Sequence, residues 1–155
     1  MTKAVLPPAV YVQTDEHLHQ VAQALAAEPA LAVDTESNIL YAYREQVCLF
    51  QVSTRTQDYI IDPLTINDMS PLGTLLADPQ IEKVFHAAEY DVLCIKRAYS
   101  YEVNNIFDTM IAARVCGYPL FGLGNMVEAL YGVQLDKSHQ RDDWGQRPLP
   151  PTSLA

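Results

Sequence analysis

Two carboxylates stand out first, because they share one side of a predicted strand. Apolar and polar residues alternate over positions 31–36, and successive side chains of a strand point to opposite faces. Asp34 and Glu36 therefore point the same way, roughly 7 Å apart along the strand. Like charges held together away from water repel each other, so either this strand end is solvated or a cation lies between the two carboxylates.

A third carboxylate, Asp91, is predicted to point toward the same place. It lies in the first turn of a predicted helix that follows a strand, on the same helical side as Cys94. An acidic residue also stabilises the positive end of a helix, but Glu89 meets that need from the surface. Because parallel sheets bind ligands at the C-terminal ends of their strands, we expect Asp91 to reach the cleft of Asp34 and Glu36.

These three side chains define the chemistry to expect. Carboxylates offer only oxygen ligands, which suit Mg²⁺ or Mn²⁺ rather than zinc. Two such ions roughly 4 Å apart can activate a water molecule and stabilise the leaving oxygen of a phosphodiester. The sequence therefore favours a metal-dependent hydrolytic site, with a solvated strand end as the alternative interpretation.

Several other side chains that could do chemistry also have structural interpretations. Asp142 and Asp143 could supply a further carboxylate, although a solvated loop beside a packed Trp144 is favoured. His86 directly follows a strand, where it could face a substrate or be hydrogen-bonded at the strand end. Asp108 is better interpreted as a helix N-cap than as a catalyst.

Two arginines and two tyrosines leave the same choice open. Arg141 and Arg147 could contact phosphate near the cleft or form salt bridges. Tyr41 and Tyr43 could stack on bases or be ordinary surface aromatics. Asp62, which precedes a proline, is interpreted as a residue that shapes a turn.

The hydrophobic pattern predicts the elements that position these side chains. Helices are expected over residues 15–27, 71–77, 88–99, 109–116 and 123–131, and strands over 31–36, 47–52, 58–61, 82–85 and 103–107. The first ten residues should be a loose lead-in, and the chain from residue 133 onward irregular, with an extended end. Short links make the early strands antiparallel, and helical links make the later ones parallel. The expected fold is α/β, a mixed sheet with helices on both faces.

Composition bounds the function and the compartment. Ten Lys and Arg against nineteen Asp and Glu give a net charge of −9, which excludes a general phosphate-coating protein because such a protein needs a basic face. Cations at a local site would offset part of this charge. A chain of 155 residues fits a single domain over residues 1–155. No signal peptide or transmembrane helix is recognisable, so the cytoplasm is the expected compartment.

Three cysteines agree with that compartment. Their number is odd, their spacing is wide and each lies in an apolar run, so we expect reduced core residues at Cys48, Cys94 and Cys116.

The acidic motifs, taken in order, resemble a known family. Asp34-Thr35-Glu36, and Asp91 at the end of VFHAAEYD (residues 84–91), are similar to the first two exonuclease motifs of the DEDD superfamily, in its ribonuclease D-like 3′–5′ exonuclease branch. Segments 107–113, 123–127 and 137–149 resemble that branch as well, so the likeness covers about residues 10–155. It implies a ribonuclease H-like fold and two-metal hydrolysis that releases 5′-nucleotides from an RNA 3′ end.

The resemblance also implies roles for single residues. Asp34, Glu36 and Asp91 would be the catalytic metal ligands for Mg²⁺ or Mn²⁺, with two ions in a complete family site. Thr35 and His86 would contact the substrate. The implied partner is a single-stranded RNA 3′ end, with DNA left open, and nothing in the sequence points to a membrane or a protein partner.

The likeness stops short of one family motif. After an RPL-type segment the family continues into a helix carrying Tyr-x-x-x-Asp, whereas this sequence ends at Ala155. We therefore expect the fourth acid, the tyrosine and the C-terminal helix of the fold to be missing, which would uncover an apolar face. The expected consequence is weak or no activity, since hard cations need several oxygen ligands. A non-catalytic RNA- or protein-binding module with the same fold is the alternative.

Overall fold

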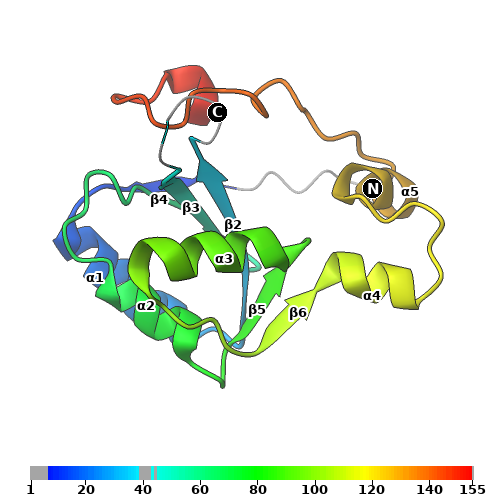
Figure 1. Cartoon of the computed structure of the whole chain (residues 1–155), viewed down its shortest axis with the longest axis horizontal. Coiled ribbons are helices and arrows are strands. Elements are labelled where there is room, and N and C mark those ends of the chain that lie inside the picture. The colour runs from blue at the N-terminus through cyan, green and yellow to red at the C-terminus, as the bar shows by residue number, and fades with distance from the viewer. Residues whose placement is uncertain (1–6, 39–42, 44, 155) are drawn as a thin grey trace.

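A six-stranded mixed sheet lies at the centre of the computed structural model, which describes residues 7–38, 43 and 45–154 (Figure 1). The strand order is β1-β4-β3-β2-β5-β6. As predicted, the β2–β3 and β3–β4 pairs are antiparallel and the β2–β5 and β5–β6 pairs are parallel. The β1–β4 pair is also parallel. The strands are β1 (Val10–Val12), β2 (Ala30–Ser37), β3 (Val47–Ser53), β4 (Asp58–Ile61), β5 (Glu82–Phe85) and β6 (Ile106–Asp108).

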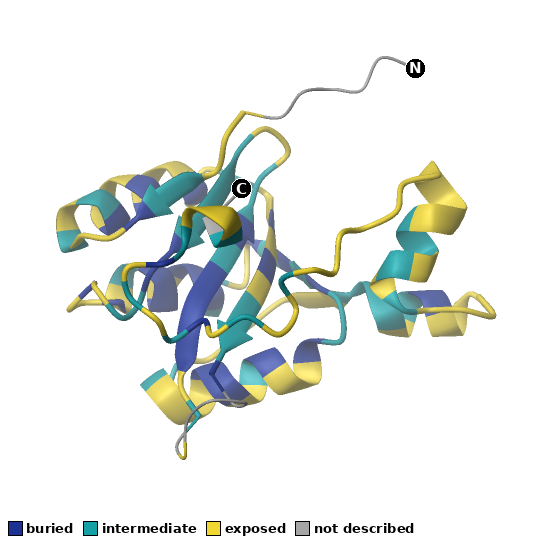
Figure 2. Ribbon diagram, turned by 90° about the horizontal axis from the view of Figure 1, so that it is seen from above, coloured by how far each residue is buried: buried dark blue, intermediate teal, exposed yellow. Residues whose placement is uncertain are grey.

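Three helices cover one face of this sheet. They are α1 (Asp15–Leu25), α2 (Ser70–Ala77) and α3 (Ala88–Tyr99), and their apolar sides form the main core with the inward residues of the strands. Thr14 caps α1, because its hydroxyl accepts a hydrogen bond of 3.2 Å from the His17 N–H. Figure 2 shows the buried residues concentrated on the central strands and on the helix sides that face them.

The rest of the chain leaves this layer. Helices α4 (Thr109–Val115) and α5 (Leu123–Tyr131) extend to one side (Figure 1), and Ala113 is the single fully buried residue in these two helices. The C-terminal segment then returns to the second face of the sheet. There Trp144 and Leu149 pack on Cys48 and Leu49 of β3 to form a smaller core.

A buried ion pair fastens the returning segment to the sheet. The Asp62 side chain is fully buried, and its two carboxylate oxygens each accept a hydrogen bond of 2.7 Å from Arg147. The remaining guanidinium N–H groups donate to the main-chain oxygens of Cys48, Trp144 and Gln146, so all five donors of Arg147 are used. Of the two interpretations of Arg147, the structure supports the salt bridge.

The structure corrects four expectations. An unpredicted strand, β1, begins at the last residue of the predicted lead-in and pairs with β4 in parallel, and β6 begins at Ile106 instead of residue 103. The C-terminal end is not fully extended, because a 3₁₀ helix, η1, covers Pro151–Leu154. Cys48 and Cys94 are buried, but Cys116 is exposed just after α4, where its run of residues has no partner surface.

No helix within the described ranges has the length and apolar character needed to cross a bilayer.

The Asp62–Arg147 pair generates the first prediction. Arg147→Met leaves a buried carboxylate without its counter-charge, so we expect a loss of about 3–5 kcal/mol in unfolding free energy, measured by urea denaturation. Arg114→Met is the matched control, because Arg114 only lies over the Phe121 ring, 5.2 Å from its centroid, and should cost about 1 kcal/mol or less. Equal losses in the two variants would contradict a structural role for the ion pair.

Candidate active site

Strand β2 presents its acidic side chains at the end of the sheet's central strand. Leu31 and Val33 are buried on the helix-covered face, whereas Asp34 is exposed and Glu36 is half-buried, as the alternation predicted. Strand β2 pairs with β5 over residues 30–32 and with β3 over residues 32–37, so β3 holds the stretch of backbone that carries both carboxylates. The two carboxylates therefore stand on a rigid support.

A tight turn after β5 aims helix α3 at the same place. Ala87 takes the left-handed conformation (φ 63°), which costs a residue with a side chain about 1 kcal/mol. Asp108 supports the turn, because its carboxylate accepts hydrogen bonds from the N–H groups of Ala87 (3.1 Å) and Ala88 (2.8 Å). The same carboxylate also accepts from Met110 and Ile111, so Asp108 is the predicted cap of α4 and a cap of α3 as well.

Thr35 joins Asp91 to the strand. The Asp91 Oδ1 accepts hydrogen bonds from the Thr35 N–H (3.2 Å) and the Thr35 hydroxyl (2.5 Å). The same N–H lies 3.0 Å from Oδ1 of Asp34, so both carboxylates meet at one amide. Asp91 is only 8% exposed, as expected for an inward-pointing residue. Thr35 thus positions Asp91, and its predicted contact with substrate stays a prediction.

Burial raises the pKa of all three carboxyl groups, and repulsion between these carboxylates adds to the shift at two of them. Desolvation and then repulsion from Asp91 raise the pKa of Asp34 to about 6. Desolvation, followed by repulsion from the other two and from Asp142, raises the pKa of Glu36 to about 7. Desolvation also raises the pKa of Asp91, although the hydrogen bonds from Thr35 oppose this shift. A divalent cation would remove this repulsion.

Asp142 takes part in the electrostatics of the site. It accepts hydrogen bonds from the His139 ring (2.7 Å) and the Ser153 hydroxyl (2.9 Å), and these hold its pKa below the usual range. It is therefore ionised at neutral pH and close enough to Glu36 to raise the pKa of that residue. The favoured interpretation of a purely solvated loop missed this coupling, because it joins residues more than a hundred positions apart.

The donor set fits a hard cation by its chemistry. All three side chains supply carboxylate oxygens, and their mutual repulsion falls when a cation binds. Across residues 7–38, 43 and 45–154, however, no three acidic, histidine or cysteine side chains already converge as a set of metal ligands. The charges of Asp34, Glu36 and Asp91 thus lie near one another, but their oxygens do not yet form a binding site. A bound ion would still have to bring these oxygens together.

A cavity of about 300 Å³ opens beside Asp34. His86 lines it, and the His86 Nδ1 lies 2.9 Å from the Thr109 hydroxyl. The cavity adjoins the carboxylates and is large enough for part of a nucleotide. Of the two tyrosines that could stack on bases, Tyr43 is fully exposed and Tyr41 lies outside the described residues.

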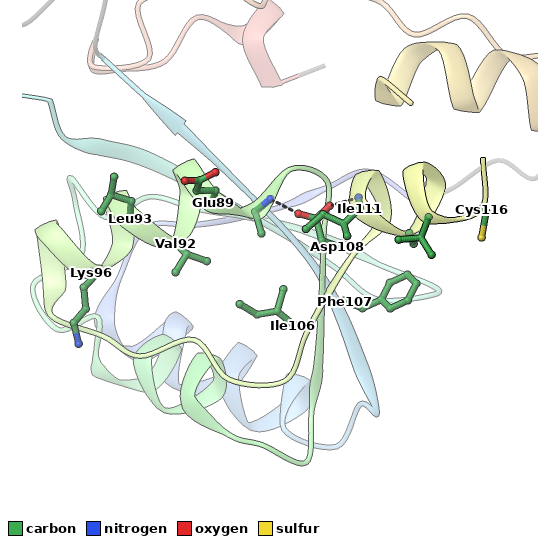
Figure 3. Close-up of a pocket in the computed structure, with 12 residues that line it drawn as sticks. Glu89, Val92, Leu93, Lys96, Ile106, Phe107, Asp108, Ile111 and Cys116 are labelled. Carbon is green, nitrogen blue, oxygen red and sulfur yellow. Dashed lines mark hydrogen bonds between the residues drawn. The ribbon is translucent and has the colours of Figure 1, made fainter. Parts of the chain in front are cut away.

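A larger, apolar groove lies apart from this cavity. It has a volume of about 980 Å³ between α3, β6 and α4, and Figure 3 shows Asp108 at its edge. None of Asp34, Glu36 or Asp91 lines it, so the groove is a surface for packing rather than for the expected hydrolysis. Its main apolar side chains are Val92, Leu93, Ile106, Phe107, Ile111 and Val115.

Comparison with known proteins places the chain in a family. A family model described as a 3′–5′ exonuclease matches residues 9–155, and the chain belongs to that family. Among curated proteins, it is 40% identical over 141 residues to Protein RRP6-like 3 of Arabidopsis thaliana, covering 90% of this chain and 16% of that protein. It is 36% identical over 156 residues to ribonuclease D of Gluconacetobacter diazotrophicus, covering 99% of this chain and 40% of that one.

Solved structures agree on the fold. Ribonuclease D of Escherichia coli, an exoribonuclease involved in structured RNA processing, superposes with a TM-score of 0.88 at 37% identity, over 95% of this chain and 40% of that chain. The catalytic core of RRP6 from Trypanosoma brucei gives 0.90 at 34% identity, over 99% of this chain and 43% of that one. The chain therefore has the ribonuclease H-like fold of ribonuclease D and RRP6, as predicted, and it spans well under half the length of these relatives.

The raised carboxyl pKa of Asp34 predicts how stability changes with pH. Its folded-state pKa of about 6 exceeds the unfolded value, so the metal-free chain loses stability as pH rises from 4 through 6. Asp34→Asn removes that loss. At pH 7.5 we expect a Tm higher by about 2–4 °C, equivalent to about 1 kcal/mol once solvent screening of an exposed carboxylate is allowed for.

Two further measurements test this prediction. At pH 4 the difference in Tm should vanish, and Mn²⁺ should raise the Tm of the parent chain but not that of Asp34→Asn. A variant that is no more stable than the parent at pH 7.5 would contradict the repulsion described above.

The double cap at Asp108 predicts the opposite pH dependence. Although desolvation opposes it, four backbone N–H donors hold the pKa of Asp108 below its usual range, so its stabilisation is present at neutral pH and disappears as pH falls below about 4. Asp108→Asn should cost about 2 kcal/mol at pH 7 by urea denaturation, and much less at pH 3. Asp136→Asn is the control, because Asp136 caps the single exposed N–H of Ser138. A pH-independent loss at Asp108 would contradict the charged cap.

Proposed function

We propose that this chain is a 3′–5′ exoribonuclease domain that removes nucleotides from RNA 3′ ends with the help of divalent cations. The observation that carries the proposal is the coupled set of Asp34, Glu36 and Asp91 at the end of β2, in a chain of the 3′–5′ exonuclease family. The 37% sequence identity to ribonuclease D of E. coli, which is an exoribonuclease, supports RNA over DNA as the substrate.

Each residue of the set has a distinct task. Asp34 and Glu36 hold cations from the strand, and Asp91 holds them from α3 with an orientation fixed by Thr35. The bound Mg²⁺ or Mn²⁺ ions supply water activation and stabilise the charge on the leaving oxygen. The cavity beside Asp34 receives the terminal nucleotide, with His86 on its wall.

The number of carboxylates sets the expected rate. Hard cations prefer six or more oxygen ligands, and three carboxylates leave much of that shell to water and substrate. Asp142 adds negative charge nearby but keeps its oxygens on His139 and Ser153. We therefore expect slow trimming by these 155 residues.

A trimming assay tests the proposal. The purified chain is incubated with a 5′-labelled single-stranded RNA and Mn²⁺ or Mg²⁺. We expect stepwise shortening from the 3′ end, release of 5′-mononucleotides, and a rate at least about tenfold lower for Asp34→Asn, since losing a cation-bound carboxylate costs more than 1.4 kcal/mol. Glu16→Gln, on the exposed side of α1, is the control that should keep the parent rate.

The outcomes separate the two candidate functions. Trimming that persists unchanged in Asp34→Asn would overturn the site assignment. A folded chain that binds Mn²⁺ and RNA without any trimming would favour the alternative, a non-catalytic binding module with the same fold. This alternative is retained because no three potential metal ligands converge in the part of the chain that the structure describes.

A further inference from the structure

The apolar groove between α3, β6 and α4 includes an open edge of the sheet. Strand β6 ends the strand order, so in the described part of the chain its outer edge has no neighbouring strand. Its apolar residues Ile106 and Phe107 line the groove and are exposed. Proteins normally cover such an edge with a helix, a loop or another chain, because its unpaired N–H and C=O groups favour pairing with another strand.

The apolar area of the groove is large for a surface that faces water. Five of its side chains are between 41% and 82% exposed: Leu93, Ile106, Phe107, Ile111 and Val115. Since a large apolar side chain offers roughly 100–200 Å², these five together present roughly 300–500 Å². A standard protein interface buries about 800 Å² on each partner, of which roughly 450–500 Å² is apolar. The groove therefore has the apolar area that one half of such an interface needs.

The charges on the α3 wall of the groove form a self-complementary pattern. One stripe of α3 lines the groove, and it consists of Glu89, Val92, Leu93 and Lys96 (Figure 3). Their i, i+3, i+4, i+7 spacing places an acid and a base at opposite ends of an apolar pair, about 10 Å apart along the helix. When two such helices pack antiparallel about a two-fold axis, Glu89 of each copy meets Lys96 of the other. Val92 of each copy then meets Leu93 of the other.

We propose that a second copy of this chain occupies the groove, in a two-fold dimer whose α3 helices pack antiparallel with the axis near Val92 and Leu93. Both copies use the same surface, so association stops at the dimer. Burial of the apolar groove drives association, and the two Glu89–Lys96 contacts select the antiparallel orientation. Lys96 also pairs with Glu102 of its own chain. That pair is exposed to solvent, and the ammonium group has three N–H donors, so it can bind a second carboxylate.

The net charge limits the affinity of this dimer. Each copy carries a charge of −9, so two copies repel each other within a Debye length, about 8 Å at physiological salt. Association also costs translational and rotational freedom, which an interface of standard size only partly exceeds. We therefore expect a weak dimer, with a Kd of about 10–100 µM.

Sedimentation equilibrium of the 155-residue chain, from about 1 to about 300 µM, tests the proposal. The parent should change from monomer to dimer over this range without forming larger species. Glu89→Lys and Lys96→Glu each place like charges at both contacts and should weaken the dimer at least about tenfold. An equal mixture of these two variants should dimerise about as well as the parent, because opposite charges then meet at both contacts. This rescue cannot arise within one chain, since the two positions are about 10 Å apart on the helix, and it shows that both variants are folded.

Two apolar variants test the groove itself. Ile111→Ser removes an exposed apolar side chain of α4 from both halves of the interface, and it should weaken the dimer at least about tenfold. Leu130→Ser is the matched control, because Leu130 is similarly exposed (51% against 55%) but lies on α5, outside the groove. This variant should dimerise like the parent.

Each contrary result overturns a defined part of the proposal. A chain that stays monomeric up to about 300 µM would exclude a second copy as the occupant of the groove. A dimer that Leu130→Ser weakens as much as Ile111→Ser would place the contact outside the groove. A dimer that both charge reversals leave intact, or a mixture that does not restore association, would exclude the antiparallel pairing of α3.

Discussion

Mutual repulsion between carboxylates is the constraint to which the rest of this structure responds. Desolvation raises the pKa of Asp34, Glu36 and Asp91, and repulsion between neighbouring carboxylates adds to the shifts of Asp34 and Glu36. Such a cluster lowers stability when no cation is bound, so it persists only where rigid elements hold it. Here the elements are the central strand β2, which is paired with β3 along the stretch that carries the acids, and helix α3, which is tied to β2 through Thr35.

Asp108 couples the two halves of the site. Its carboxylate caps α3, which carries Asp91, and also caps α4, which begins at Thr109. Thr109 in turn orients His86 at the edge of the cavity. This half-buried carboxylate therefore supports both the helix that carries Asp91 and the helix whose first residue contacts His86. A displacement of Asp108 would move Asp91 and His86 together, although Asp108 itself takes no direct part in the chemistry.

Local pattern predicted most elements, and non-local contacts account for what it missed. Alternation identified β2, and helical periodicity with a closing Gly132 identified α5. Strand β1 has only three residues and exists through its pairing with β4, some fifty positions away, so no local pattern distinguishes it from a loop. The same holds for Lys83, whose buried ammonium group donates to the main-chain oxygens of Leu75 in α2 and of Ile81 just before β5. The acids of the site were predictable by type, but the link from Thr35 to Asp91 was not.

The charge balance also limits how an RNA can be held. The chain carries a net charge of −9, and several of its cations are already engaged: Arg147 uses all five donors on protein atoms, Lys83 is buried, and Lys96 pairs with Glu102. Long stretches of backbone phosphate therefore gain little from the protein itself. In the proposed function, recognition therefore comes from the terminal nucleotide, through cations held at the carboxylates. On that proposal the domain selects chain ends, because an end brings its terminal nucleotide and phosphate to the same place.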